Sequence, residues 1–250
     1  MSISLAFLLL VLGTLFASMA VYAALGRKPD EDARRKNAQF VGGAFDFVLH
    51  WFLWLVTPAT TLSLRLGLTP DFYNFAGLLF GLLSGLALAR GGSEIAGWML
   101  VLSGVCDILD GRIARAMGVT SRYGAFIDSM LDRFIELAFF LGFAFFLRHS
   151  PHGALAATLA LGGSVLVSYA RSVGESLGVE CTGGLMQRGE RLTLLSLASL
   201  GDRDLSARLG LAQGTVLLGV AYFIGLAGLT TAVHRTVWIA RRLRTDAGGK

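Results

Sequence analysis

The chain has 250 residues, of which 54% are hydrophobic and 16% are charged. A soluble domain usually carries about 25% charged residues, so this composition excludes both a disordered chain and a soluble globular domain. The net charge of +5 raises the alternative of nucleic-acid binding, but the basic residues lie at the ends of apolar segments and in loops. There they are typical of membrane topology and of contacts with anionic lipids. We therefore expect an all-α, polytopic integral membrane protein with no nucleic-acid partner.

The first apolar segment carries no charge from Met1 to Gly26 and is long enough to cross a bilayer. It lacks a basic start and is longer than the core of a signal peptide, so we expect a retained transmembrane helix over Ile3–Leu25. The following linker, residues 26–37, contains five basic residues, which predicts a cytoplasmic location. Residues 1–37 are therefore expected to form an N-terminal unit outside the core.

The next apolar segment, Phe47–Leu64, is apolar enough to span a membrane yet contains His50, two tryptophans and Pro58. Arginines at the ends of the later segments gather on one side of the predicted core, which indicates that this side is cytoplasmic. A span over Phe47–Leu64 would separate the basic linker from those arginines. We therefore expect this segment to be a juxtamembrane helix in the interface, with its tryptophans at headgroup level.

Further apolar segments, separated by breaks that contain glycine or proline, predict a core of six transmembrane helices. Their approximate ranges are 72–90, 94–117, 121–148, 153–178, 187–201 and 210–241. The fifth segment is the weakest, because ten uncharged residues separate Arg191 from Asp202 and it spans only with its charged ends included. The expected organisation is an N-terminal unit (1–37), a membrane domain (38–242) and a cytoplasmic tail (243–250).

Four aspartates fall within two neighbouring predicted helices, where ionisable side chains are unfavourable and usually functional. Asp107 and Asp110 share one stripe of the second core helix, and Asp128 and Asp132 form an i,i+4 pair on the third. The short connection between these helices predicts a hairpin that brings both stripes together near the cytoplasmic end. Converging carboxylates need neutralisation, and the hard divalent cations Mg²⁺ and Mn²⁺ prefer oxygen ligands. Two such ions, about 3.5–4 Å apart, form the usual clamp for displacement at phosphorus.

Small residues lie on the same stripes as the aspartates. Gly111, Ala114 and Gly124 leave a slot in which a flat group can approach the backbone. Arg115 adds a guanidinium fork suited to a phosphate. The alternative is a buried lattice of salt bridges, but such a lattice would not require small residues beside the acids.

These residues match, at every fixed position, the signature D-x₂-D-G-x₂-A-R-x₈-G-x₃-D-x₃-D of the CDP-alcohol phosphatidyltransferase family, which the chain resembles over roughly residues 40–242. The resemblance implies six helices around a polar cavity that opens to the cytoplasm. It also implies a multi-pass protein of the cell (inner or cytoplasmic) membrane that displaces CMP from a CDP-linked lipid with an alcohol, using divalent metal. Members of the family commonly form homodimers, so a homodimer is a further expectation.

The same resemblance implies a role for each residue of the signature. The expected metal ligands are the four aspartates: Asp107, Asp110, Asp128 and Asp132. Asp132 is also the expected general base for the acceptor hydroxyl. The residues expected to hold the CDP-lipid are Asp107, Gly111, Ala114, Arg115 and Gly124.

A second group of polar residues, at the cytoplasmic ends of later core helices, includes Arg171, Arg191 and Arg235. Arginine binds phosphate oxygens through two donors at once, so these three would form a pocket for a phosphorylated acceptor. The segments around them resemble the phosphatidylinositol-phosphate synthase type within the family, although Arg171 replaces a lysine and Gly189 replaces a proline. For each arginine, and for Arg188 nearby, the alternative is placement by membrane topology or snorkelling.

The predicted function is transfer of a phosphatidyl group from CDP-diacylglycerol to a small polyol, with inositol phosphate favoured and glycerol 3-phosphate as the alternative acceptor. A cation-coupled transporter would also line a helix bundle with acids, but transport sites lie near mid-membrane, whereas these acids lie at the end of a hairpin. A structural or partner-binding membrane protein leaves the small residues unexplained. The expected partners are CDP-diacylglycerol, the polyol or its phosphate, and membrane lipids.

Overall fold

The structure is a computed structural model that describes residues 3–26, 43–181, 184 and 187–248. Within these residues every regular element is a helix, which confirms the all-α class predicted from the sequence. The helices are α1 (Ile3–Ala24), α3 (Gly43–Arg65), α4 (Pro70–Ala89), α5 (Ser93–Met117), α6 (Arg122–Phe146), α7 (Gly153–Ser176), α8 (Arg188–Arg208) and α9 (Thr215–Gly248). The basic linker predicted after α1 lies, from residue 27 onward, outside the described residues.

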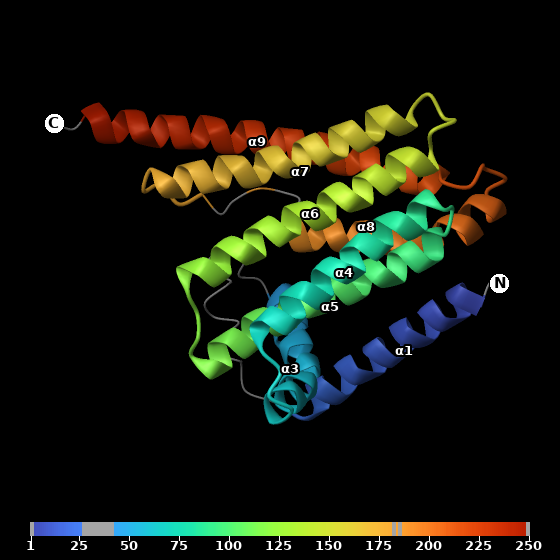
Figure 1. Ribbon diagram of the computed structural model, residues 1–250, viewed down its shortest axis with the longest axis horizontal. Coiled ribbons are helices and arrows are strands. Elements are labelled where there is room, and N and C mark those ends of the chain that lie inside the picture. Colours follow the sequence, from blue (N-terminus) through green and yellow to red (C-terminus); the bar gives the residue numbers. More distant parts are fainter. Residues whose placement is uncertain (1–2, 27–42, 182–183, 185–186, 249–250) are drawn as a thin grey trace.

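Helices α4 to α9 run side by side as one elongated bundle (Figure 1). Within it, α4 packs against α5 and α6, and α7 packs against α9. Helix α8 packs against both α5 and α9, and α6 packs against α7, so the two groups form one body. The connections α4–α5, α6–α7 and α8–α9 lie at one end of the bundle, and the α5–α6 connection lies at the other (Figure 1).

Glycines allow two helix pairs to approach closely. On α4 they recur every four residues, at Gly77, Gly81 and Gly85, and a Cβ at Gly85 would overlap the carbonyl oxygen of Ala138 on α6. On α7, a Cβ at Gly163 would lie 2.9 Å from the carbonyl oxygen of Gly225 on α9. Small residues at this spacing are typical of tightly packed membrane helices.

The apolar core occupies the half of the bundle that contains the C-terminal part of α6. Phe139, Phe140 and Phe143 are almost completely buried there, together with Leu195 of α8 and Leu217 of α9. The polar residues discussed below belong to the N-terminal part of α6 and to the opposite end of the bundle. One end of the bundle therefore contains the apolar core that stabilises the helix packing, and the other end contains the polar residues of the candidate site.

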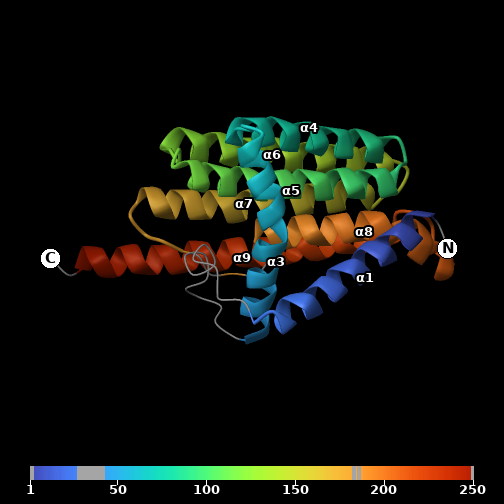
Figure 2. The ribbon, with the colours of Figure 1, turned by 90° about the horizontal axis from the view of Figure 1, so that it is seen from below.

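Helix α3 lies across the bundle rather than along it (Figure 2). Arg112 of α5 fixes this arrangement, because its guanidinium donates to the Leu53 carbonyl at 2.6 Å and to the Thr57 hydroxyl at 3.2 Å. Helix α1 joins α3 through the Trp51 indole, which donates to the Ser18 hydroxyl at 2.9 Å. The crossed orientation agrees with the juxtamembrane helix expected over Phe47–Leu64, and its position at the membrane surface is retained as a proposal.

Three described helical stretches are long and apolar enough to cross a membrane: Pro70–Ala89, Gly153–Ser176 and Thr215–Thr245. Helices α5, α6 and α8 have comparable lengths of 25, 25 and 21 residues, but they carry the polar residues. These features support a membrane protein with several spans. The count of six core spans plus one remains a proposal.

Two helices end well beyond the predicted residues. Helix α8 was expected to end near residue 201, but it continues to Arg208 because Asp202 is fully buried, and its carboxylate accepts from the backbone N–H groups of Gly214 and Leu217. A buried acid with such partners does not break a helix. Helix α9 runs past the predicted end near residue 241 to Gly248, so the predicted tail is helical as far as it is described.

Candidate functional site

The hairpin between α5 and α6 brings the two aspartate stripes together, as predicted. Gly118 ends α5 in the left-handed conformation, with a φ of 68° that favours glycine. Ser121 then starts α6, and its hydroxyl accepts from the Gly124 backbone N–H at 3.0 Å. This short connection reverses the chain, so that the carboxylates of Asp107 and Asp110 on α5 meet that of Asp128 on α6, although the two helices themselves pack against α4 rather than against each other.

Three of the four predicted aspartates form one cluster. Asp107, Asp110 and Asp128 each offer a carboxylate oxygen, and these oxygens all lie within 4.8 Å of one another. The residues come from both helices of the hairpin, and Asp110 is buried. A set of carboxylate oxygens converging at this range fits a hard divalent cation such as Mg²⁺ or Mn²⁺.

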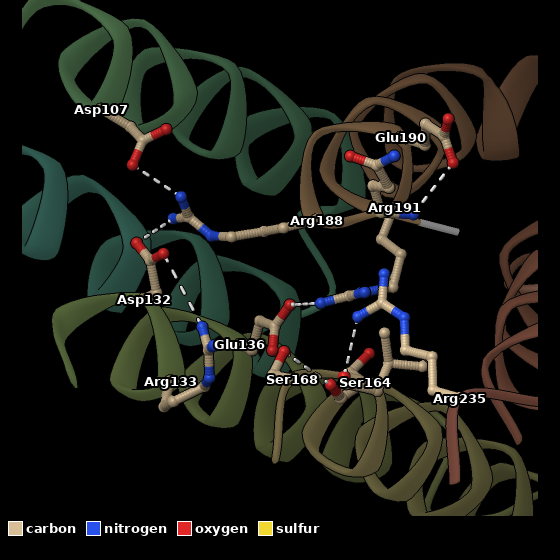
Figure 3. A network of polar contacts seen from close by, with 12 residues as sticks. Asp107, Asp132, Arg133, Glu136, Ser164, Ser168, Arg188, Glu190, Arg191 and Arg235 are labelled. Carbon is tan, nitrogen blue, oxygen red and sulfur yellow. Dashed lines mark hydrogen bonds and ion pairs between the residues drawn. The ribbon is translucent and has the colours of Figure 1, made fainter. Parts of the chain in front are cut away.

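The fourth aspartate, Asp132, lies next to this cluster and is tied to it by Arg188 (Figure 3). One guanidinium nitrogen of Arg188 contacts the Asp107 carboxylate at 2.6 Å, and the other contacts Asp132. Arg133 approaches the second oxygen of Asp132 at 3.7 Å. We refer to Asp107, Asp110, Asp128, Asp132 and Arg188 as the acid layer.

The start of α8 determines where Arg188 points. Arg188 is the first residue of this helix, and the Glu190 carboxylate accepts from the Gln187 backbone N–H at 2.9 Å, which closes the first turn back on its cap. The Arg188 side chain extends from this fixed turn between α5 and α6 (Figure 3). The sequence interpretation did not assign Arg188 to the site, because an arginine at a helix end is equally typical of membrane topology.

The small residues of the signature lie on the partly exposed side of the acid layer. A Cβ at Gly111 would lie 3.2 Å from the Arg115 guanidinium, so a larger side chain would press on that group. A Cβ at Gly124 would lie 3.4 Å from the Ser121 hydroxyl that caps α6. Gly111, Ala114, Arg115 and Gly124 are all partly exposed, so a ligand can reach the backbone beside the acids.

A second polar cluster lies one turn further along α6 than Asp132. It consists of Glu136, Arg191 and Arg235, and we call it the arginine layer. Glu136 follows Asp132 by one turn, and its carboxylate accepts from the Arg191 guanidinium at 2.7 Å, with both side chains 2% exposed. Arg235 of α9 donates to the Val167 carbonyl at 3.0 Å, also in buried surroundings. Figure 3 shows the two guanidinium groups facing the same region between α6, α7 and α8.

The structure thus brings together two of the three arginines predicted for an acceptor pocket. Arg171 lies at the edge, where its side chain is half exposed and pairs with Glu175 of the same helix at 2.7 Å. Glu136 was not predicted, although its position four residues after Asp132 places it on the aspartate stripe and is a signal that the sequence contains.

Comparison with known proteins gives a consistent result. Residues 68–227 match the profile described as CDP-alcohol phosphatidyltransferase, a range that leaves out α1 and α3. The phosphatidylinositol phosphate synthase of Streptomyces avermitilis is 34% identical over 197 residues, which cover 76% of this chain and 80% of that protein. The archaetidylinositol phosphate synthase of Methanothermobacter thermautotrophicus is 30% identical over 180 residues, which cover 72% and 87%.

Solved structures with a similar fold include the phosphatidylinositol phosphate synthase of Mycobacterium tuberculosis. Its crystal structure with CDP-DAG bound has a TM-score of 0.64 and 26% sequence identity, covering 74% of this chain and 92% of that one. A second crystal structure of that protein, in complex with manganese and citrate, has a TM-score of 0.64 and 25% identity, covering 74% and 88%. These proteins are similar to the present chain over most of their own length.

Proposed function

Because the chain belongs to the CDP-alcohol phosphatidyltransferase family, we propose that it transfers a phosphatidyl group from CDP-diacylglycerol to inositol phosphate and releases CMP. One observation carries the proposal. Asp128, Asp132 and Glu136 form a single stripe of α6 that connects a carboxylate cluster suited to a divalent cation with buried arginines suited to a phosphate. The relatives named as phosphatidylinositol phosphate synthases support the choice of acceptor.

In this proposal the four aspartates of the acid layer, Asp107, Asp110, Asp128 and Asp132, hold two Mg²⁺ or Mn²⁺ ions. When bound, the ions would supply positive charge for the pyrophosphate of the CDP-lipid and for the departing CMP. Asp107 also faces the CDP-lipid, together with Gly111, Ala114, Arg115 and Gly124. The two glycines and the alanine keep the approach to the backbone open, and Arg115 offers its fork of donors to a phosphate.

Asp132 acts as the general base. Its carboxylate removes the proton from the acceptor hydroxyl while the acceptor oxygen forms a bond to the phosphorus of the phosphatidyl group. The bond between that phosphorus and the bridging pyrophosphate oxygen breaks, and CMP leaves with the bonding electrons. Asp132 lies beside the carboxylate cluster and one turn from Glu136, a position that an acceptor held by the arginine layer would reach.

The arginine layer provides the site for the acceptor phosphate. Arg191 and Arg235 project from different helices toward one region (Figure 3), where their guanidinium groups offer donors to a phosphate. Arg171, at the exposed edge, would meet the acceptor as it enters. Glycerol 3-phosphate carries the same phosphate and is the second candidate acceptor. Family membership argues against the cation-coupled transporter considered from the sequence.

The proposed location is the inner (cytoplasmic) membrane, with the acid layer facing the cytoplasm. Helix α1 ends toward α3 and the hairpin end of the bundle, where the acids lie (Figure 1), and five basic residues follow this helix in the sequence. By the positive-inside rule, that side is cytoplasmic. A homodimer is proposed because members of the family commonly form homodimers.

CMP release by the purified protein in detergent tests the function. The assay supplies CDP-diacylglycerol and Mg²⁺, with inositol 1-phosphate, glycerol 3-phosphate, inositol and serine as separate acceptors. We expect turnover with inositol 1-phosphate that EDTA abolishes and added Mg²⁺ or Mn²⁺ restores. Turnover with glycerol 3-phosphate alone would move the assignment to the alternative acceptor. No CMP release with any of the four would contradict the proposed acceptors.

A further inference from the structure

The contacts of Arg188 have a consequence for metal binding that the family assignment does not contain. We infer that the Arg188 guanidinium competes with the divalent cation for Asp107 and Asp132, so that metal loading displaces this side chain. The inference rests on the metal site of the proposed function, but it does not depend on the acceptor. Arg188 is then a positioning residue that lowers the metal affinity of the acid layer, so that a higher metal concentration is needed to load the site.

The geometry of Arg188 carries the inference. Its two terminal nitrogens reach one carboxylate on each helix of the hairpin, Asp107 at 2.6 Å on α5 and Asp132 on α6. The side chain is 18% exposed, and the two carboxylates are 31% and 10% exposed. Charge-assisted contacts of this kind in partly buried surroundings are stronger than the same contacts in water.

One of these carboxylates belongs to the observed cluster suited to a metal, and the other, Asp132, is a metal ligand in the proposed function. Asp107 belongs to the cluster of three acids whose oxygens lie within 4.8 Å of one another. An ion held by that cluster would lie beside a positively charged guanidinium, and like charges at such short range repel. Arg188 and a divalent cation therefore cannot both occupy this part of the acid layer at full strength.

Displacement of Arg188 also opens Asp132. While the guanidinium contacts Asp132 from one side and Arg133 approaches from another, an acceptor hydroxyl cannot reach that carboxylate directly. Once the guanidinium moves, the Asp132 oxygen that it contacted is open to the cation and to the acceptor, and the freed fork can bind a phosphate oxygen. Metal loading and exposure of the proposed base are thus one event.

Mn²⁺ binding to the full-length protein in detergent, with no substrate present, tests the inference. The loss of the electron paramagnetic resonance signal of free Mn²⁺ reports binding. We expect Arg188→Met to bind Mn²⁺ about tenfold more tightly than the unchanged protein, equivalent to about 1.4 kcal/mol. The matched control is Arg203→Met on the same helix, whose side chain is 67% exposed and approaches the Glu94 carboxylate at 3.9 Å, away from the acid layer; the Mn²⁺ affinity of this variant should not change.

An equal or weaker Mn²⁺ affinity for Arg188→Met would overturn the inference. So would the absence of Mn²⁺ binding by both the unchanged protein and Arg188→Met, which would remove the metal site as well. If the variant fails to fold, the unchanged protein decides: phenylglyoxal should modify Arg188 several-fold faster with Mn²⁺ than without it, and Arg203 at a constant rate. Equal or slower modification of Arg188 would contradict displacement. Both measurements omit substrate, so they can succeed even if the CMP-release assay fails.

Discussion

Helix α8 buries charge at both of its ends, and the two ends differ in the partners that they use. At the C-terminal end, the Asp202 carboxylate accepts from backbone N–H groups of Gly214 at 2.6 Å and Leu217 at 3.1 Å, where α9 begins. At the N-terminal end, Arg188 and Arg191 contact the side chains of acids on other helices. The first arrangement caps a helix, and the second assembles charged side chains that can exchange partners.

The comparison shows that burial of a charge does not by itself mark a functional site. Main-chain partners cannot leave without unfolding the helix that they belong to, so Asp202 is bound to the fold. Side-chain partners can rotate away when a ligand offers better contacts, so Arg188 and Arg191 remain available for chemistry. The predictions that follow test this difference, from the largest expected effect to the smallest.

Loss of a single carboxylate from the acid layer should separate activity from folding most clearly. Asp132→Asn and Asp128→Asn should each lower CMP release by at least about a thousandfold, because the first removes the proposed base and both weaken the metal site. The temperature of thermal unfolding in detergent should stay close to that of the unchanged protein. Asp204→Asn, at the other end of α8, is the control and should keep full activity. Full activity in either acid-layer variant would contradict the two-metal assignment.

Removal of the Asp202 carboxylate, at the other end of α8, should lower stability rather than activity. Asp202→Ala leaves two buried N–H groups without their acceptor, which should destabilise the fold by about 3 kcal/mol, since each such group contributes roughly 1–3 kcal/mol. The change is measured as a lower temperature of thermal unfolding. Asp202→Asn keeps one acceptor oxygen and should lose about half as much. An altered KM for either substrate in the Asn variant would show that this end also serves the reaction.

The arginine layer should respond through the acceptor. Arg191→Lys keeps the charge opposite Glu136 but loses the fork of donors, so the acceptor KM should rise about tenfold while the KM for the CDP-lipid changes little. Steady-state kinetics with each substrate varied in turn measure the two constants. Arg203→Lys serves as the matched control. Equal effects on both KM values would argue against an acceptor-phosphate pocket.

The smallest effect is expected outside both ends of α8, where α1 meets α3. Trp51→Phe removes the indole N–H that donates to Ser18 at 2.9 Å, and a partly buried hydrogen bond of this kind contributes about 1 kcal/mol. The contact between α1 and α3 should loosen, which limited proteolysis would detect as faster cleavage after α1. CMP release should not change. A loss of activity would show that α1, which lies outside the family match, contributes to the reaction.

The sequence predicted the elements whose signals are local. The hairpin of α5 and α6 and the clustering of Asp107 with Asp110 and Asp128 follow from spacing and caps within short segments. The helix α3 was inferred from the distribution of arginines over the whole core, and its place in the interface stays a prediction. The extra turns of α8 were not predicted, because the partners of Asp202 belong to another helix. A charged residue near the end of an apolar segment predicts the end of a helix, unless its hydrogen-bond partners on other helices are known.

The role of Arg188 could not be predicted for a similar reason. It lies 81 residues from Asp107 in the sequence, and an arginine placed there by membrane topology has the same pattern as one placed there by chemistry. Glu136 carries a local signal through its spacing from Asp132, but only its contact with Arg191 shows that it belongs to a second polar layer. In both cases the deciding fact is which helices become neighbours.

The hydrogen bond between Arg112 and the Leu53 carbonyl ties the position of the acids to that of α3. Arg112 follows Asp110 by two residues on α5, so the helix that carries the acids also carries the attachment of α3. With α3 at headgroup level, as proposed, the acids cannot move along the membrane normal without moving α3 through the interface. The carboxylates therefore stay at the level where a lipid phosphate and a water-soluble alcohol can meet, and a change in bilayer thickness would tilt the bundle around this level.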